Sequence, residues 1–257
     1  MNGKVSISIV LLLSAALIGC ASSAERKARQ DQIDKRVETH VMLGATYLQR
    51  GQLDVAKKEL EIALNESPND SQANNIMAVL QWRLRNLDEA ERLFRRSLNS
   101  DEKNPSAQHN YGTFLCDRGR LDEAIRYFDT AAVNQLYPYA AEVNLNAGVC
   151  LMKKPLPSAA ERYFREALKI NPKLPGALYQ MAKISIDSGN RLSARGFIER
   201  YFQSADDTPE ALLLAVKIEH ALKNKNAEAS YALRLRNKFP NSPEAEQLHG
   251  LSSSGKR

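Results

Sequence analysis

The chain has 257 residues, and its 36 lysines and arginines against 30 aspartates and glutamates give a formal net charge of +6. Basic and acidic residues are interspersed, as in residues 24–36 (AERKARQDQIDKR), without the long block of one sign that marks a nucleic-acid-binding arm. The sequence therefore predicts a mildly basic protein with no nucleic-acid partner.

The first 19 residues have the three-part layout of a secretory signal. Lys4 supplies a positive start, residues 5–19 are uncharged and rich in leucine, and the small Gly19 precedes the break. The uncharged run of 15 residues is shorter than the roughly 20 that a membrane-spanning helix needs. A stable transmembrane anchor is therefore not expected.

Residues 17–20, Leu-Ile-Gly-Cys, resemble the bacterial lipobox. The resemblance implies that the Cys20 thiol takes a diacylglyceryl group and that a peptidase cuts just before it. Ala21 rather than aspartate follows, which favours export to the outer membrane, with the body of the protein facing the periplasm. Three acyl chains anchor firmly, because each buried methylene contributes about 0.8 kcal/mol. The alternative is an ordinary signal peptide with a chance cysteine.

Residues 20–36 are polar and are predicted to form a lipidated linker between the anchor and the body of the protein. If this segment is flexible, it gives a tether of roughly 20–25 Å.

The remainder of the chain carries an internal repeat. Small residues recur at intervals of 34, 34, 36 and 34, at Gly44, Ala78, Gly112, Gly148 and Ala182. Twelve residues after each stands an alanine, and 16 residues after each a bulky apolar residue. This pattern resembles the tetratricopeptide repeat, in which two antiparallel helices pack closely. The resemblance implies an all-α fold, a right-handed superhelix of about six helix-turn-helix repeats.

The repeats are expected near residues 37–70, 71–104, 105–138, 141–174, 175–208 and 209–240, followed by a short cap and a disordered tail over 241–257. Gly51, Gly119 and Gly189 lie between the two helices of their repeats, where a left-handed backbone favours glycine. Pro155 replaces this glycine in the fourth repeat, and two extra residues lengthen the segment before it, which predicts a local distortion.

Nothing in the sequence points to catalysis. The histidines are His40, His109, His220 and His249, and none has a cysteine or a second histidine at metal-ligand spacing. There is no glycine-rich phosphate loop and no Gly-x-Ser-x-Gly elbow. The sequence predicts no enzyme, no metal, no cofactor and no small-molecule substrate, so a catalytic pair could arise only from groups that folding brings together.

The first helices of such repeats line a concave face, whose exposed positions usually hold the ligand. Reading those positions by register predicts an apolar partner-binding groove on the first four repeats, and not on the fifth and sixth. Its residues are Val41, Ala45, Leu48, Asn75, Val79, Trp82, His109, Thr113, Cys116, Leu145, Val149 and Met152. Trp82 and Met152 are the strongest candidates for contact with a partner, because aromatic residues and methionine are enriched at interface centres. The alternative is that these residues pack against neighbouring helices.

Repeat proteins that grip an acidic carboxyl terminus resemble one another in placing lysine, asparagine and arginine at these positions. Here Val41 and Ala45 stand where the first lysine and asparagine would be, so that carboxylate clamp is absent. Asn110 and Asn146 remain as candidate backbone binders.

Cys116 and Cys150 fall late in the first helices of adjacent repeats, at register positions that differ by two. Side chains on adjacent helices can meet the Cα separation of a disulfide, roughly 5.5–6 Å. The alternative is two buried free thiols that act as small apolar residues.

The order of lipobox, polar linker and about six repeats narrows the resemblance. Together with residues 110–124 (NYGTFLCDRGRLDEA), 136–138 (LYP) and 148–155 (GVCLMKKP), it is similar to the type IV pilus assembly lipoproteins of the PilF/PilW family. The resemblance implies a pilotin, an outer-membrane lipoprotein that binds subunits of the pilus secretin and promotes their outer-membrane localisation and multimerisation. The alternative is an envelope lipoprotein that scaffolds peptidoglycan or outer-membrane-protein assembly machinery.

Overall fold

The structure, a computed structural model, describes the backbone of residues 4–134, 136–153 and 157–254 and the side chains of residues 23–134, 136–153 and 158–248. The described residues form helices joined by short turns, without a strand, so the all-α prediction is confirmed. The chain divides into two compact units, Met1–Asn110 and Tyr111–Arg257.

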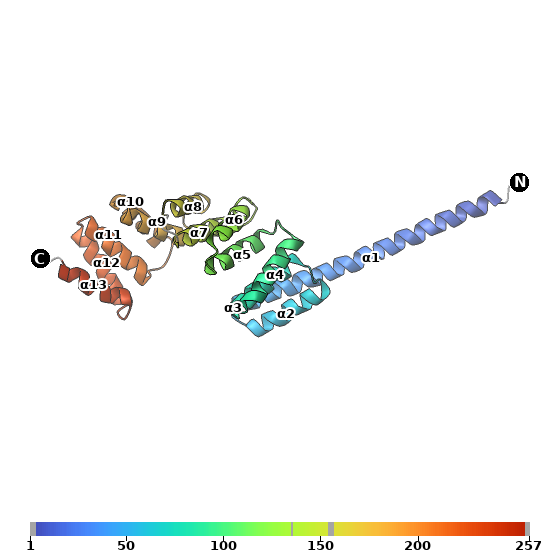
Figure 1. Cartoon of the computed structure of the whole chain (residues 1–257), viewed down its shortest axis with the longest axis horizontal. Coiled ribbons are helices and arrows are strands. Elements are labelled where there is room, and N and C mark those ends of the chain that lie inside the picture. The colour runs from blue at the N-terminus through green and yellow to red at the C-terminus, as the bar shows by residue number, and fades with distance from the viewer. Residues whose placement is uncertain (1–3, 135, 154–156, 255–257) are drawn as a thin grey trace. The chain divides into compact units, whose positions relative to one another are not determined.

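Figure 1 shows the helices of both units in chain order. The first unit holds α1 (Lys4–Gln49), α2 (Leu53–Glu66), α3 (Ser71–Arg83), α4 (Leu87–Ser100) and the start of α5 (Pro105–Asp117). The second unit continues with α6 (Leu121–Ala132), α7 (Ala140–Leu151), α8 (Pro157–Ile170), α9 (Pro175–Asp187), α10 (Arg191–Phe202), α11 (Pro209–Ala221), α12 (Lys225–Lys238) and α13 (Pro243–Ser254).

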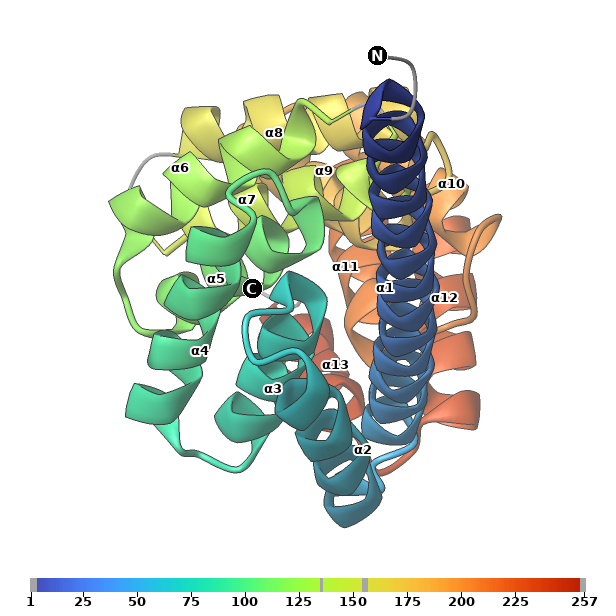
Figure 2. The ribbon, with the colours of Figure 1, turned by 90° about the vertical axis from the view of Figure 1, so that its right-hand side faces the viewer.

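Consecutive helices pack as pairs, one pair for each repeat. In the first unit α2 packs on α1, α4 packs on α3, and α3 lies between α2 and α4 (Figure 2). In the second unit the pairs are α7 with α8, α9 with α10 and α11 with α12, and α13 packs on the last pair. Stacking of pairs is what buries the apolar face of each repeat, because a single helical hairpin cannot cover it alone.

The polar linker, residues 20–36, is part of helix α1, which differs from the flexible tether whose length was calculated from the sequence. Its sequence explains the difference, since alanine, glutamate, arginine, lysine and glutamine are all good helix formers. Side chains 23–36 of this stretch are exposed, apart from the half-buried Ile33. In the part of the chain whose placement is described, no helix combines the length and the apolar character needed to cross a membrane.

The recurring small residues set how closely the two helices of a repeat approach. A Cβ atom added to Gly148 would lie 2.5 Å from Cε1 of Phe164, and one added to Gly112 would lie 2.9 Å from Cε1 of Phe128. The bulky residue 16 positions later therefore fills the space opposite the small residue of its own repeat. The contact lies within one repeat, which explains the fixed spacing of 16.

The turn between the two helices requires a left-handed residue, as predicted. Gly51, Gly119 and Gly189 have φ angles of +74°, +76° and +78°. In the second and sixth repeats Arg85 and Lys223 adopt the same conformation, with φ angles of 65° and 59°. Neither was expected from the sequence, because a residue with a Cβ atom rarely adopts this conformation. The equivalent position around Pro155 lies outside the described residues.

We expect Gly148→Ala to destabilise the protein by about 1–3 kcal/mol, because the new methyl group overpacks the fully buried Phe164. Gly196→Ala is the matched control, also in mid-helix, where an added Cβ meets no atom within 4 Å. It should stabilise the protein by up to about 1 kcal/mol through helix propensity. Urea denaturation of both variants measures the difference, and equal shifts would contradict close packing at Gly148.

Candidate functional site: a cavity on the first helices of repeats four to six

The structure describes the side chains of three histidines, His40, His109 and His220. Nδ1 of His40 lies 2.7 Å from Oε2 of Glu59, and Nδ1 of His220 lies 3.0 Å from Oε1 of Glu228. Burial lowers the pKa of His109 to about 4, so this imidazole is neutral at neutral pH. Across the described part of the chain, no group of three or more histidine, cysteine, aspartate or glutamate side chains could hold a metal ion.

Four residues of the predicted groove lie in the core, and two of them, Asn75 and Cys116, are 0% and 6% exposed. Val41 and Leu48 are only 8% and 5% exposed, so the prediction that they line an open groove is wrong. Val41 packs with Ala63 of α2 and Ala73 of α3. The close approach of the second repeat covers this position, which is the packing alternative that the sequence left open.

The other predicted groove residues remain at least partly accessible. Val149 is 39% exposed. The half-buried ones are Ala45, Val79, Trp82, His109, Thr113, Leu145 and Met152. Val79 and Trp82 belong to the first unit, and Leu145 and Met152 belong to the second. The single strip that register suggested across these residues stays a prediction.

Asn110 is already engaged in the first unit. Its Nδ2 donates to Oδ1 of Asn75 over 3.1 Å, and Nδ2 of Asn75 donates to Oγ of Ser106 over 3.2 Å. Asn75 itself is fully buried. This chain of amides joins α3 to α5, so the Nδ2 group of Asn110 has a structural role, and the contact of Asn110 to a ligand backbone stays a prediction.

Cys116 of α5 and Cys150 of α7 form a disulfide, with their Cα atoms 5.8 Å apart. The sequence left open a disulfide or two buried free thiols, and the structure has the disulfide. Nζ of Lys153 donates to the carbonyl oxygen of Cys116 over 3.1 Å, beside the bridge. The first helices of the third and fourth repeats, α5 and α7, are thus linked covalently.

Reduction of this bridge should lower the free energy of unfolding by about 3–4 kcal/mol, since it closes a loop with a sequence separation of 34. Urea denaturation with and without dithiothreitol measures this loss. A Cys116→Ala/Cys150→Ala double variant is the control and should unfold alike in both conditions. If reductant leaves the wild-type midpoint unchanged, the bridge contributes no stability.

A cavity of about 410 Å³ opens on the first helices of the last three repeats, within the second unit. Its walls come from α7, α9 and the start of α11, with one side chain from α10. The lining residues are Leu145, Asn146, Val149, Pro175, Gly176, Tyr179, Gln180, Tyr201, Thr208 and Glu210. The volume lies within the roughly 300–1,000 Å³ typical of ligand-binding clefts.

The 34-residue period brings these residues together. Leu145 of α7 and Tyr179 of α9 occupy the same register position, and so do Gly176 of α9 and Glu210 of α11. A Cβ atom added to Gly176 would lie 2.7 Å from Cδ2 of Leu145. The absence of a side chain at this one position therefore lets Leu145 extend over the start of α9.

The cavity is apolar with a negative rim. Burial raises the pKa of Tyr179, and the carboxylates of Glu210 and Glu244 raise it further. Glu210 is the one charged residue among the described residues that line the cavity. Tyr179 also contacts Tyr201, with ring centroids 6.3 Å apart. The lining can therefore bind apolar and hydrogen-bonding groups.

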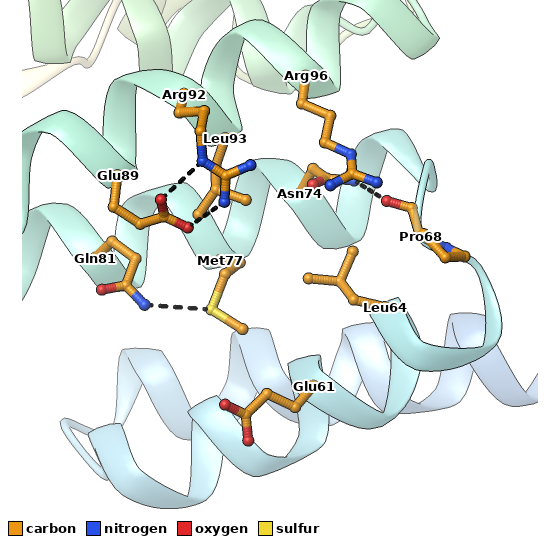
Figure 3. Close-up of a pocket in the computed structure, with 10 residues that line it drawn as sticks. All are labelled: Glu61, Leu64, Pro68, Asn74, Met77, Gln81, Glu89, Arg92, Leu93 and Arg96. Carbon is orange, nitrogen blue, oxygen red and sulfur yellow. Dashed lines mark hydrogen bonds and ion pairs between the residues drawn. The ribbon is translucent and has the colours of Figure 1, made fainter.

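A second pocket, of about 230 Å³, lies in the first unit between α2, α3 and α4 (Figure 3). Glu89 accepts two hydrogen bonds from Arg92, over 2.8 and 2.6 Å, which lowers the pKa of Glu89 and raises that of Arg92. Arg96 donates to Oδ1 of Asn69 over 3.3 and 3.1 Å. Glu89 and Arg92 are thus paired with each other within the chain, and the Arg96 guanidinium is hydrogen-bonded to a neutral amide.

The sequence matches the tetratricopeptide repeat family over residues 41–107 and 115–175. The chain is a tetratricopeptide-repeat protein. It is 28% identical over 246 residues to the type IV pilus assembly protein PilF of Pseudomonas aeruginosa, covering 95% of this chain and 98% of that one.

Two solved structures of type IV pilus proteins have the same fold. Pseudomonas aeruginosa PilF superposes with a TM-score of 0.79 at 28% identity, over 85% of this chain and 99% of that chain. The type IV pilus biogenesis factor PilW superposes with a TM-score of 0.73 at 29% identity, over 82% of this chain and 97% of that one. The tetratricopeptide-repeat chain is therefore homologous to PilF and PilW.

The sequence-based groove ended at the fourth repeat, whereas the cavity continues through the fifth and sixth. Tyr179, Gln180, Thr208 and Glu210 were missed for this reason. Continuing the 34-residue register onward from Leu145 would have found Tyr179, so the signal was present in this tetratricopeptide-repeat sequence. Weaker consensus in the last repeats had argued against looking there.

Proposed function

We propose that the chain is a pilotin, a lipoprotein of type IV pilus biogenesis that binds secretin subunits and promotes their localisation and multimerisation in the outer membrane. The observation that carries this proposal is the likeness to the pilus assembly protein PilF over 95% of this chain and 98% of that one. Likeness over the whole length of both chains supports a shared role better than likeness between a few repeats.

The architecture suits a binding module. Tetratricopeptide repeats bind other proteins on the faces of their stacked helices, and the second unit has an open apolar cavity on the first helices of three repeats. Such a site acts by holding a secretin subunit and needs no catalytic group. The proposal is accordingly of a partner-binding protein without an enzymatic step or a cofactor.

The lipobox-like residues 17–20 complete the proposal. Acylation of Cys20 would tether the repeats to the outer membrane, and the exposed helical stretch that follows, residues 23–36, would hold them away from the bilayer. At 1.5 Å per residue, the helix from residue 20 to residue 36 spans about 24 Å. The repeats would then meet secretin subunits in the periplasm, next to the membrane in which the ring forms.

A pull-down from an envelope extract tests the function directly. The tagged, full-length lipidated chain should recover secretin subunits, and an extract from cells that carry the untagged chain serves as the control. Deletion of the gene should abolish pili and twitching motility while cell shape stays normal. Recovery of peptidoglycan or outer-membrane-protein assembly machinery without secretin, together with altered cell shape, would instead favour an envelope scaffold.

Replacement of the proposed acylation site tests the anchor separately. Cys20→Ser should leave the repeats folded, because the core begins at Val37, but should strand the protein at the inner membrane with its signal attached. Secretin rings should decrease or mislocalise, as membrane fractionation and palmitate labelling would reveal. Outer-membrane fractionation of this variant, with no labelling of the wild type, would refute lipidation at Cys20.

A further inference from the structure

We infer that the cavity across α7, α9 and α11 is the docking site for a secretin segment that carries a large apolar side chain next to a lysine or arginine. The apolar side chain would enter between Leu145, Val149 and Tyr179, and the cation would lie beside Glu210. This inference rests on the proposed function and names the chemistry of the segment that the protein recognises.

The walls of the cavity select the apolar anchor. Leu145, Val149 and Pro175 present aliphatic surface, and Tyr179 and Tyr201 present aromatic rings. Val149 remains 39% exposed, so apolar surface is available to a partner without any unfolding. Burying one large apolar side chain in a preformed cleft is the usual centre of a protein interface.

The charge of the cavity selects the cation. The chain as a whole is basic, with a formal net charge of +6, yet neither lysine nor arginine is among the described residues that line the cavity. Glu210 stands at its rim with no ion-pair partner among the described side chains. A positive residue of a bound segment would complement this carboxylate and steer the encounter.

Glu244 reinforces the same field. It lies 34 residues after Glu210, in the first turn of α13, and both follow a Ser/Thr-Pro pair that begins a helix. Both carboxylates raise the pKa of the Tyr179 hydroxyl, which places their charges near this side chain of the cavity. The helix dipole accounts for an acidic residue in each first turn. The helix dipole is not an ion-pair partner, so the Glu210 carboxylate can still accept a positively charged side chain from a bound segment.

Two other carboxylates of the second unit, those of Glu219 and Asp207, are paired within the chain. Glu219 forms two hydrogen bonds with Arg195, over 2.8 and 2.6 Å, and the nearly buried Asp207 pairs with Arg234 and with Lys238. The carboxylates of Glu219 and Asp207 thus stabilise the packing of the helices, whereas the carboxylate of Glu210 at the cavity rim has no such role among the described side chains. A carboxylate that the fold does not use is available to a partner.

Binding of purified full-length protein to purified secretin subunit tests the inference. Glu210→Lys should weaken binding by roughly tenfold or more, and the wild-type affinity should fall as salt rises. Val149→Asp should weaken binding by a similar factor, because it places a charge on the apolar wall. Glu246→Lys is the matched control: it changes the same charge in the first turn of α13, away from the cavity lining, and should leave the affinity within about twofold.

Gly176→Ala separates shape from charge. The added methyl group displaces the end of Leu145 and changes the cavity without altering any charge, so it should weaken binding while the salt dependence stays that of the wild type. Melting curves of all variants serve as the folding control. A photo-crosslinking residue in place of Val149 identifies the bound segment of the secretin. Changing the lysine or arginine of that secretin segment to glutamate should then restore its binding to the Glu210→Lys variant.

Two failures are distinguishable. If wild-type protein does not bind secretin, the proposed function fails and the inference fails with it. If wild-type protein binds and the folded Glu210→Lys and Val149→Asp variants bind equally well, the proposed function stands and the cavity is not the docking site. A change of oligomeric state in these variants, without loss of secretin binding, would make a second copy of this chain the occupant and would also overturn the inference.

Discussion

The rest of the structure depends on the close contact between one small residue and the bulky residue 16 positions later in the same repeat. At Gly148 the space is so tight that a single added carbon would come within 2.5 Å of the Phe164 ring. This contact fixes how near the two helices lie, and repetition of it every 34 to 36 residues makes the first helices equivalent. A surface built from equivalent helices follows from that repetition.

The candidate site arises where the repeating positions stop being equivalent in chemistry. Gly176 and Glu210 occupy the same register position, and one leaves room for Leu145 while the other brings a charge. Leu145 and Tyr179 are related in the same way, as aliphatic and aromatic walls of one cavity. The fold thus repeats the backbone, and individual substitutions at repeated positions give the cavity its apolar and acidic character. The covalent link between Cys116 and Cys150 joins α5 to α7, and α7 is one wall of the cavity.

Much of the fold could be read from the sequence because its determinants are local and periodic. The spacing of Gly44, Gly112 and Gly148 predicted the helix pairs, and the turn glycines predicted left-handed backbone. The site was less predictable, because register tells which face a residue occupies but not how deeply a neighbouring helix covers it. Val41 and Leu48 look like groove residues in the sequence and lie in the core, since the second repeat packs over the first. The cavity of repeats four to six is formed by side chains from α7, α9 and α11 together, so its shape cannot be read from the register of any one helix.

The central claim is that the first helices of repeats four to six hold a secretin segment. Hydrogen–deuterium exchange of the full-length chain, alone and with secretin subunit, tests it most directly, because amides that a partner covers exchange more slowly. The account predicts added protection in α7, in α9 and in the first turns of α11, around Leu145, Tyr179 and Glu210. Protection confined to α2, α3 and α4, or no change on adding secretin, would contradict it.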